Sequence, residues 1–259
     1  MAVAFPRYRL ALLLLFAVGS ASISCGQEPD RYRLEVEAGY SHDRSAYTQG
    51  LFFYKDTLYE SCGQYGESSF RKVNIADGRT LRRMNFDSRY FIEGSVVLNG
   101  RLYLLTWQEH KCFVYDADSW NYLGELYNFT EGWGLTTDGK ELIMSDGSAT
   151  LYRLDPMTFM VRSKVEVTLN GKKVRFLNEL EYIDGRLWAN VYGSDEIVII
   201  DPDDGKVMAV VDCRNLLSRS LRTAATDVLN GIAYNPKDNS LYLTGKNWPR
   251  LYKVKLVKK

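Results

Sequence analysis

The 259-residue sequence predicts an all-β fold, a five-bladed β-propeller closed by its N-terminal strand. Three observations predict it: short apolar strands separated by tight turns, a unit of these strands that recurs five times, and a last unit that lacks one strand. Asn-Gly and Asp-Gly pairs flanked by apolar runs are the strongest short-range signal of a β-hairpin, and they mark several of these turns. Helical periodicity is weak, so we expect only one short helix, around Asn215 to Leu221.

The repeat consists of five segments that align over 15 residues, with two extra residues in the turn of the last segment. Their first residues lie 44, 40, 45 and 52 positions apart. A period of about 40 to 50 residues that holds several strands is typical of a propeller blade, so five units predict five blades. The segments are "QGLFFYKDTLYESCG" (Gln49 to Gly63), "EGSVVLNGRLYLLTW" (Glu93 to Trp107), "WGLTTDGKELIMSDG" (Trp133 to Gly147), "NELEYIDGRLWANVY" (Asn178 to Tyr192) and "NGIAYNPKDNSLYLTGK" (Asn230 to Lys246).

The two ends of the chain predict how the ring closes. After Asn230 there is room for three strands, whereas "RYRLEVEAGYS" (Arg31 to Ser41) is a strand without a blade of its own. We expect this segment to pair as the fourth strand of the last blade. Closing the ring removes exposed strand edges, which otherwise favour aggregation.

Residues 1–25 have the pattern of an export signal. Arg7 and Arg9 supply a positive region, and the apolar run from Leu10 to Val18 is too short to span a bilayer. The propeller is expected to follow over residues 30–259. The mature protein is therefore expected to work outside the cytoplasm, in the periplasm or cell envelope.

Two forms of the mature N-terminus remain open. Cys25 stands where a lipoprotein signal would place the lipidated cysteine, and lipidation there would anchor the protein to the membrane. The alternative is ordinary cleavage near Ala21, which leaves Cys25 as a free thiol. We expect a monomer in either case.

Composition argues against several classes of function. A net charge of +1 gives no electrostatic reason to expect nucleic-acid binding. Cys62, Cys112 and Cys213 allow at most one intramolecular disulfide, and their spacing does not resemble a metal site. His42 and His110 are isolated in the sequence, which argues for core or surface roles. We therefore expect neither a metal nor another cofactor.

Equivalent positions of the five repeats should form rings at one mouth of the central channel, because the innermost strand of each blade lines that channel. One carboxylate among aromatic and amide side chains is typical of a small pocket for a polar, uncharged group. Taken singly, the same residues could be a solvated strand end or core packing. The first positions are Gln49, Glu93, Trp133, Asn178 and Asn230, and the last are Gly63, Trp107, Gly147, Tyr192 and Lys246.

These positions lie within motifs that extend over about residues 40–255. They include "YTQGL" (Tyr47 to Leu51), "FIEG" (Phe91 to Gly94), "GWGLTTDG" (Gly132 to Gly139), "LNELEY" (Leu177 to Tyr182) and "LYLTGKNWP" (Leu241 to Pro249). In these motifs the sequence resembles the plant and bacterial glutaminyl-peptide cyclotransferases. The resemblance implies a five-bladed propeller without a catalytic metal, an acyltransferase that converts the N-terminal glutamine of peptides or proteins to pyroglutamate and releases ammonia.

The resemblance also implies roles for individual residues. Glu93 matches the catalytic carboxylate, and Lys246 matches the lysine of the family's Thr-Gly-Lys motif. Tyr47 stands where the family often has phenylalanine, and Tyr192 falls on the position of a third tryptophan. The residues implied to bind substrate are Tyr47, Gln49, Phe91, Trp107, Trp133, Asn178 and Tyr192.

Glu93 is a candidate proton shuttle, because one carboxylate can take a proton from the attacking amine and return it to the leaving ammonia. Donors to the oxyanion would come from Lys246, Gln49, Asn178 and the indole N–H groups. Lys246 could instead be only a counter-ion to Glu93. A non-catalytic propeller that binds peptides or proteins remains the alternative function, whereas a metal-dependent propeller enzyme would need more acidic ligands than these rings offer.

Overall fold

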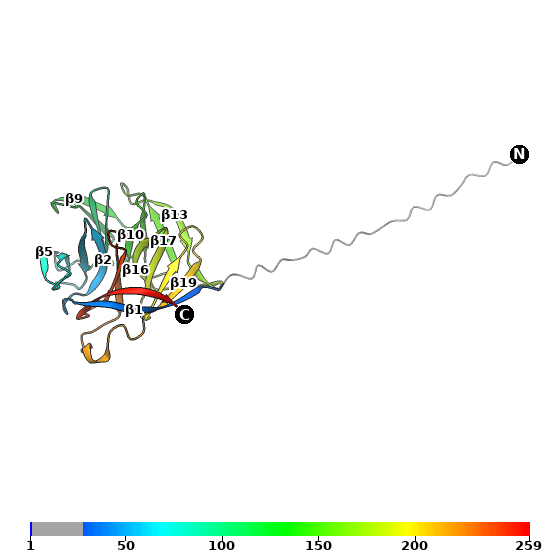
Figure 1. Cartoon of the computed structure of the whole chain (residues 1–259). Helices are drawn as coiled ribbons and strands as arrows, with labels where there is room; N and C mark the ends of the chain where they lie inside the picture. Colours follow the sequence, from blue (N-terminus) through cyan, green and yellow to red (C-terminus); the bar gives the residue numbers. More distant parts are fainter. Residues whose placement is uncertain (2–27) are drawn as a thin grey trace.

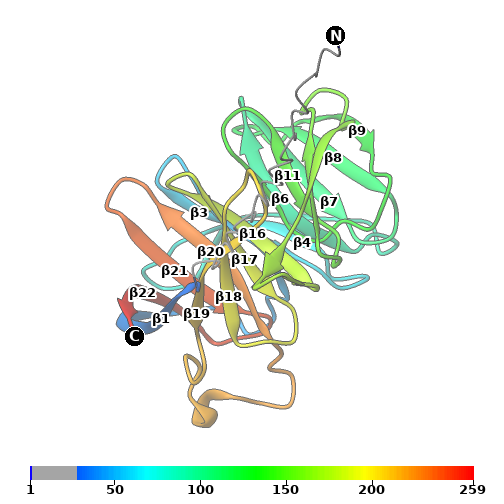
Figure 2. The same ribbon diagram turned by 90° about the vertical axis from the view of Figure 1, so that its right-hand side faces the viewer.

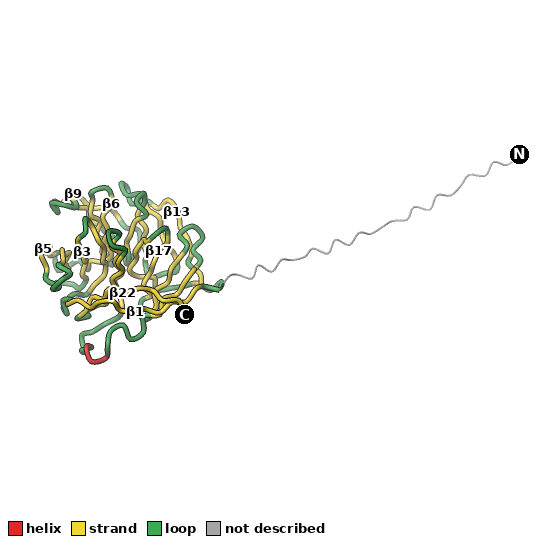
Figure 3. Tube along the Cα trace, in the orientation of Figure 1, coloured by secondary structure: helices red, strands yellow, loops and turns green. Residues whose placement is uncertain are grey.

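The computed structural model describes Met1 and residues 28–259 (Figure 1). Cys25 and the rest of the expected export signal, apart from Met1, lie outside the described residues. Strands account for almost all of the regular structure (Figure 3). Within the described part of the chain, no helix is long and apolar enough to cross a membrane.

Three four-stranded antiparallel sheets follow one another along the chain, as the repeat predicts. The first contains β2 (Thr48–Tyr54), β3 (Thr57–Cys62), β4 (Ser69–Val73) and β5 (Thr80–Asn85). The second contains β6 (Ile92–Leu98), β7 (Arg101–Thr106), β8 (Lys111–Asp116) and β9 (Tyr122–Tyr127). The third contains β10 (Leu135–Thr137), β11 (Leu142–Ser145), β12 (Thr150–Leu154) and β13 (Val161–Glu166).

The remaining large sheet has eight strands in the order β16-β17-β18-β19-β1-β22-β21-β20. Its strands are β16 (Leu177–Ile183), β17 (Arg186–Val191), β18 (Glu196–Ile200), β19 (Val207–Asp212), β1 (Asp30–Ser41), β22 (Arg250–Lys258), β21 (Ser240–Gly245) and β20 (Leu229–Asn235). A two-stranded ribbon, β14 (Thr168–Leu169) and β15 (Lys172–Lys173), lies between the third sheet and this one in sequence.

The predicted pairing of the N-terminal strand is confirmed. β1 runs antiparallel to β22 over most of its length, from Tyr32 opposite Lys258 to Ser41 opposite Arg250. Its first residues, Asp30 to Arg33, also pair in parallel with β19. This extra contact joins two groups of four strands into one sheet, so the hydrogen bonding alone does not give the predicted count of five blades.

The first strands of the successive groups contact one another in a closed cycle: β2 with β6, β6 with β10, β10 with β16, β16 with β20, and β20 with β2. Glu179 of β16 links two other strands of this cycle through its side chain. Its Oε1 accepts a hydrogen bond from Leu51 N (3.2 Å) in β2, and its Oε2 accepts one from Ile232 N (2.9 Å) in β20. Burial raises the pKa of Glu179 well above its usual value, and Glu181 raises it further.

Apolar side chains fill the spaces between neighbouring groups of strands. For example, Tyr103 and Leu105 of β7 pack with Leu142 and Met144 of β11. Cys62, Cys112 and Cys213 are buried and free. The pattern is that of a propeller-like all-β fold, in which each sheet buries both faces against its neighbours.

The helix expected over Asn215 to Leu221 is a single 3-10 turn, η1 (Arg219–Leu221). It lies in a long loop between β19 and β20 that projects from the body of the protein (Figures 2 and 3).

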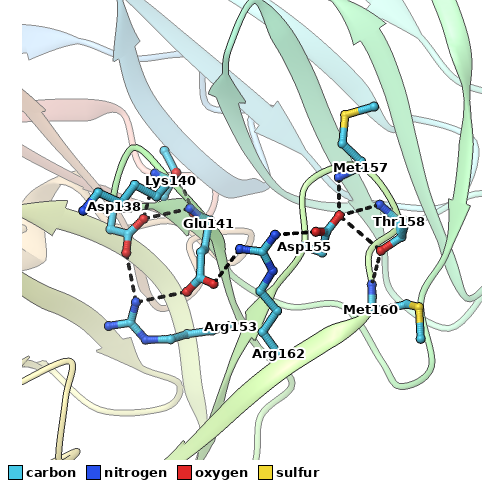
Figure 4. Close-up of polar contacts among 10 residues, drawn as sticks. Asp138, Lys140, Glu141, Arg153, Asp155, Met157, Thr158, Met160 and Arg162 are labelled. Carbon is cyan, nitrogen blue, oxygen red and sulfur yellow. Dashed lines mark hydrogen bonds and ion pairs between the residues drawn. The ribbon is translucent and has the colours of Figure 1, made fainter.

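A group of ion pairs lies on the third sheet. Arg162 pairs with Asp155 (2.5 Å) and Glu141 (3.0 Å), beside the pair of Arg153 with Asp138 (2.9 Å) (Figure 4). Hydrogen bonds, chiefly from Arg162, lower the pKa of Asp155 to about 2.

His42 is less isolated in space than in sequence. Its Nε2 lies 2.9 Å from Glu60 Oε1, and its Nδ1 lies 2.7 Å from the carbonyl oxygen of Trp248. Burial alone would lower the pKa of His42, but Glu60 outweighs burial and the pKa is raised. His42 is therefore a buried residue that ties the segment before β2 to β3 and to the turn after β21.

Candidate active site

A cavity of about 250 Å³ opens where the inner strands begin and their hairpin partners end. Ten residues line it: Tyr47, Gln49, Gln64, Phe91, Glu93, Trp107, Trp133, Asn178, Tyr192 and Lys246. All nine candidate site residues are among them, and Gln64 is the addition. Antiparallel pairing explains the convergence, because the start of one strand lies beside the end of the next.

An irregularity at one place in the inner strands aims several of these side chains. In β2, β6, β16 and β20 the register shifts directly after the first residue pair. A β-bulge re-aims a side chain that strict alternation would point to one face of the sheet. The residues in these bulges are Gln49, Glu93 with Gly94, Asn178 with Glu179, and Asn230 with Gly231.

Glu93 is buried, with 5% of its surface exposed. Gln49 Nε2 donates a hydrogen bond to Glu93 Oε1 (3.1 Å), and no described residue bonds Oε2. Burial raises the pKa of Glu93 well above its usual value, Lys246 opposes this, and Glu109 and Glu131 add to it. Gln49 is itself held by Asn230, whose Nδ2 lies 3.4 Å from Gln49 Oε1.

Lys246 is a buried cation held by aromatic rings. Its Nζ lies 4.9 Å from the ring centroid of Tyr47 and 5.1 Å from that of Tyr192. No carboxylate of the described residues lies within 4.0 Å of it, so Lys246 is not a direct counter-ion to Glu93. Burial lowers the pKa of Lys246, an effect partly offset by Glu93 and Asp227. Asp227 accepts a hydrogen bond from the Tyr47 hydroxyl (2.8 Å).

The aromatic walls meet edge to face. The ring of Phe91 lies 5.5 Å from Trp107 at 63°, and Trp133 lies 5.8 Å from Tyr192 at 78°. The glycines of the second predicted ring make room for this packing. A Cβ on Gly63 would lie 2.2 Å from the ring of Phe91, and one on Gly147 would lie 2.7 Å from that of Trp133.

The indole N–H groups of Trp107 and Trp133, which are candidate donors to an oxyanion, are already engaged in this structure. Trp107 Nε1 and Trp133 Nε1 donate to the same oxygen, Glu131 Oε2, at 2.9 and 3.0 Å. Asn178 differs, since none of the described residues hydrogen-bonds its side chain and its Oδ1 is buried. Asn178 lines the cavity, and its Nδ2 is a donor without a hydrogen-bond partner among the described residues.

Sequence reasoning passed over Glu131, Glu109 and Asp227. Each lies in a loop outside the aligned repeat, and each acts on a site residue that comes from another element. The nearest signal was the position of Glu131, two residues before Trp133. Among the described residues, no group of three or more His, Cys, Asp or Glu side chains could hold a metal ion.

Comparisons with known proteins identify the family. The chain is 44% identical to a glutaminyl-peptide cyclotransferase of Arabidopsis thaliana over 228 residues, which is 86% of this chain and 71% of that protein. It superimposes on the crystal structure of Myxococcus xanthus glutaminyl cyclase with a TM-score of 0.83 and 32% identity, covering 90% of this chain and all of the other. Residues 10–256 match the family described as glutamine cyclotransferase. The chain therefore belongs to the glutamine cyclotransferase family of enzymes.

Proposed function

We propose that this enzyme converts the N-terminal glutamine of peptides to pyroglutamate with release of ammonia, using Glu93 as a proton shuttle and no catalytic metal. The observation that carries the proposal is a single buried carboxyl group with a raised pKa in the wall of a small aromatic cavity. A cavity of about 250 Å³ suits one terminal residue rather than a length of peptide.

The cavity favours the folded-back shape of the substrate. The free α-amine must reach the γ-carboxamide carbon of the same residue, and holding the two together can lower the barrier by several kcal/mol. Phe91 and Trp107 enclose the space from the second sheet, Trp133 from the third and Tyr192 from the eight-stranded sheet. Their faces would contact the two methylene groups of the glutamine side chain when that side chain bends back toward the α-amine.

Glu93 carries the proton in both steps. The neutral amine attacks the carboxamide carbon, a new C–N bond forms, and the amine proton passes to the Glu93 carboxylate. Glu93 then gives that proton to the carboxamide nitrogen as its C–N bond breaks, and ammonia leaves. A raised pKa suits this cycle because the group is a better base than an exposed carboxylate and a competent acid near neutral pH.

The oxyanion formed on attack is stabilised by two donors of the cavity wall that none of the described residues hydrogen-bonds. These are the ammonium of Lys246 and Nδ2 of Asn178. Preorganised donors of this kind commonly contribute about 3 to 4 kcal/mol each. Gln49 has a different part, because its Nε2 already bonds Glu93 and holds the carboxyl group in place.

We further propose that the propeller has five blades, the eight-stranded sheet being two blades joined at β1 and β19. Support comes from the closed cycle of contacts among β2, β6, β10, β16 and β20. The protein is a monomer exported to the periplasm or cell envelope. Mass spectrometry of the mature N-terminus, which distinguishes a lipid on Cys25 from cleavage near Ala21, tests the export proposal.

A coupled ammonia assay on a Gln-initiated peptide, with a chelator present, tests the function. Glu93→Gln should keep the fold and lose about 10²- to 10⁴-fold in kcat, the usual contribution of general acid–base catalysis. Glu125→Gln, a change at an exposed residue of β9, is the matched control and should behave as wild type. Peptide binding by the wild type without ammonia release would favour a binding propeller. Near-normal turnover by Glu93→Gln would remove Glu93 from the mechanism.

A further inference from the structure

Glu131 joins two walls of the cavity without lining it. It lies between β9 and β10, and its Oε2 accepts hydrogen bonds from Trp107 Nε1 (2.9 Å) and Trp133 Nε1 (3.0 Å). Its Oε1 accepts a third from Gln108 Nε2 (3.0 Å). Trp107 follows β7 of the second sheet and Trp133 precedes β10 of the third, so one carboxylate holds side chains from neighbouring sheets.

The carboxylate is suited to this contact because it is ionised. Burial by itself would raise the pKa of Glu131, but hydrogen bonds from Trp133, Gln108 and Trp107 outweigh burial and lower it. Hydrogen bonds to an ionised acceptor are about twice as strong as those between neutral groups. An indole has a single N–H, so fixing that edge also fixes which face the ring turns to the cavity.

We propose that Glu131 is a positioning residue that clamps Trp107 and Trp133 and thereby sets the shape of the cavity for the folded-back glutaminyl side chain. The proposal rests on the proposed cyclisation. The remaining faces of both rings are fixed by packing, with Phe91 beside Trp107 and Tyr192 beside Trp133. Release of the clamp leaves each ring held by this packing alone.

Glu131 also acts on Glu93 through its charge, and the chain offers a control that separates the two effects. Glu109 raises the pKa of Glu93 as Glu131 does, while Lys246 lowers it. Glu109 accepts a hydrogen bond from the Tyr65 hydroxyl (2.9 Å) and bonds neither indole. Asp146 is the other carboxylate whose charge acts on Glu131.

The experiment compares Glu131→Ala, Glu131→Gln and Glu109→Gln with the wild-type enzyme. Glu131→Gln keeps an amide oxygen that can accept both indole N–H groups, so it removes the charge and retains the clamp. Kinetics on a Gln-initiated peptide are measured from pH 5 to 9. Two-dimensional ¹H–¹⁵N spectra follow the five indole N–H signals, one for each tryptophan. Thermal unfolding checks that each variant is folded.

Glu131→Ala should lose about 100-fold in kcat/KM, the scale expected when a positioned group moves by about 1 Å. Two indole signals should shift in that variant. Glu131→Gln should restore kcat/KM to within about threefold of wild type and return both signals. In Glu131→Gln and Glu109→Gln the acid limb of kcat/KM should move to lower pH, because loss of a nearby negative charge lowers the pKa of Glu93.

Unchanged indole signals and kinetics in Glu131→Ala would overturn the proposal. The proposal would also be overturned if Glu131→Gln were as inactive as Glu131→Ala while its indole signals stayed in place. The charge or the proton of Glu131 would then be required, rather than its hydrogen bonds to the two indoles. If the wild type releases no ammonia, the proposed cyclisation fails by itself. The indole spectra still decide whether Glu131 clamps the two rings.

Discussion

Gly94→Ala is predicted to destabilise the protein and to disable the site together. Gly94 follows Glu93 in the bulge of β6, and its N–H donates to the carbonyl oxygen of Trp133 (2.7 Å), two residues before β10 of the next sheet. An added Cβ would lie 2.5 Å from Leu135 N and 2.6 Å from Trp133 O. Ordinary contacts begin at 3.4 Å, so the two backbones would have to separate by up to 0.9 Å (3.4 − 2.5).

Both contacts are to backbone atoms, which cannot rotate away. Overpacking of this kind costs about 1 to 3 kcal/mol. Weakening the buried hydrogen bond adds about 1 kcal/mol or more. The free energy of unfolding should therefore fall by about 2 to 4 kcal/mol, which lowers Tm by roughly 4 to 16 °C for a domain of this size. Displacing Glu93 should reduce kcat about 100-fold.

Thermal and urea unfolding, followed by circular dichroism, measure the first effect, and the ammonia assay measures the second. Gly39→Ala is the matched control, because a Cβ there would meet only the ring of Tyr252 at 3.6 Å. That variant should stay within about 0.5 kcal/mol of wild type. A Gly94→Ala protein that unfolds with the wild-type Tm would show that the backbones are not in close contact.

Two further predictions concern charge. Lys246→Met should lower kcat about 100-fold with little change in KM if its ammonium stabilises the oxyanion, and a change confined to KM would contradict that role. Because Lys246 lowers the pKa of Glu93, its loss should move the acid limb of kcat/KM to higher pH. Burial raises the pKa of Glu181 to about 8, so the stability from this group is present below about pH 4.5 and lost as the pH rises to 8. Glu181→Gln, whose amide oxygen can still accept from Tyr234 N, should flatten that decline in urea unfolding, and an unchanged pH dependence would contradict it.

The repeat predicted much of the fold because turns and apolar alternation are local signals. It placed Gln49, Glu93, Asn178 and Lys246 around one cavity because equivalent positions in repeated units occupy equivalent places. The pairing of β1 with β22 followed from the missing strand alone.

The interactions between repeats could not be predicted in the same way. Glu131 matters because Trp107 and Trp133 reach it from different sheets, and no spacing along the chain encodes that meeting. Gly94 is required by the backbone of the neighbouring sheet, a contact that its position in the sequence does not reveal. The parallel contact of β1 with β19 depends on three-dimensional proximity and left no pattern in the sequence.

The hydrogen bonds that Glu179 accepts from two other inner strands bear on which part of a substrate the enzyme can accept. Asn178 lines the cavity, and the next residue bonds Leu51 and Ile232, each two positions further along its strand than Gln49 and Asn230. These hydrogen bonds join β2, β16 and β20 close to the cavity. We expect this closure to stop a polypeptide from threading between the inner strands, so that a terminal glutamine enters the cavity more easily than one with chain on both sides. Selectivity for chain ends would then follow from the shape of the cavity.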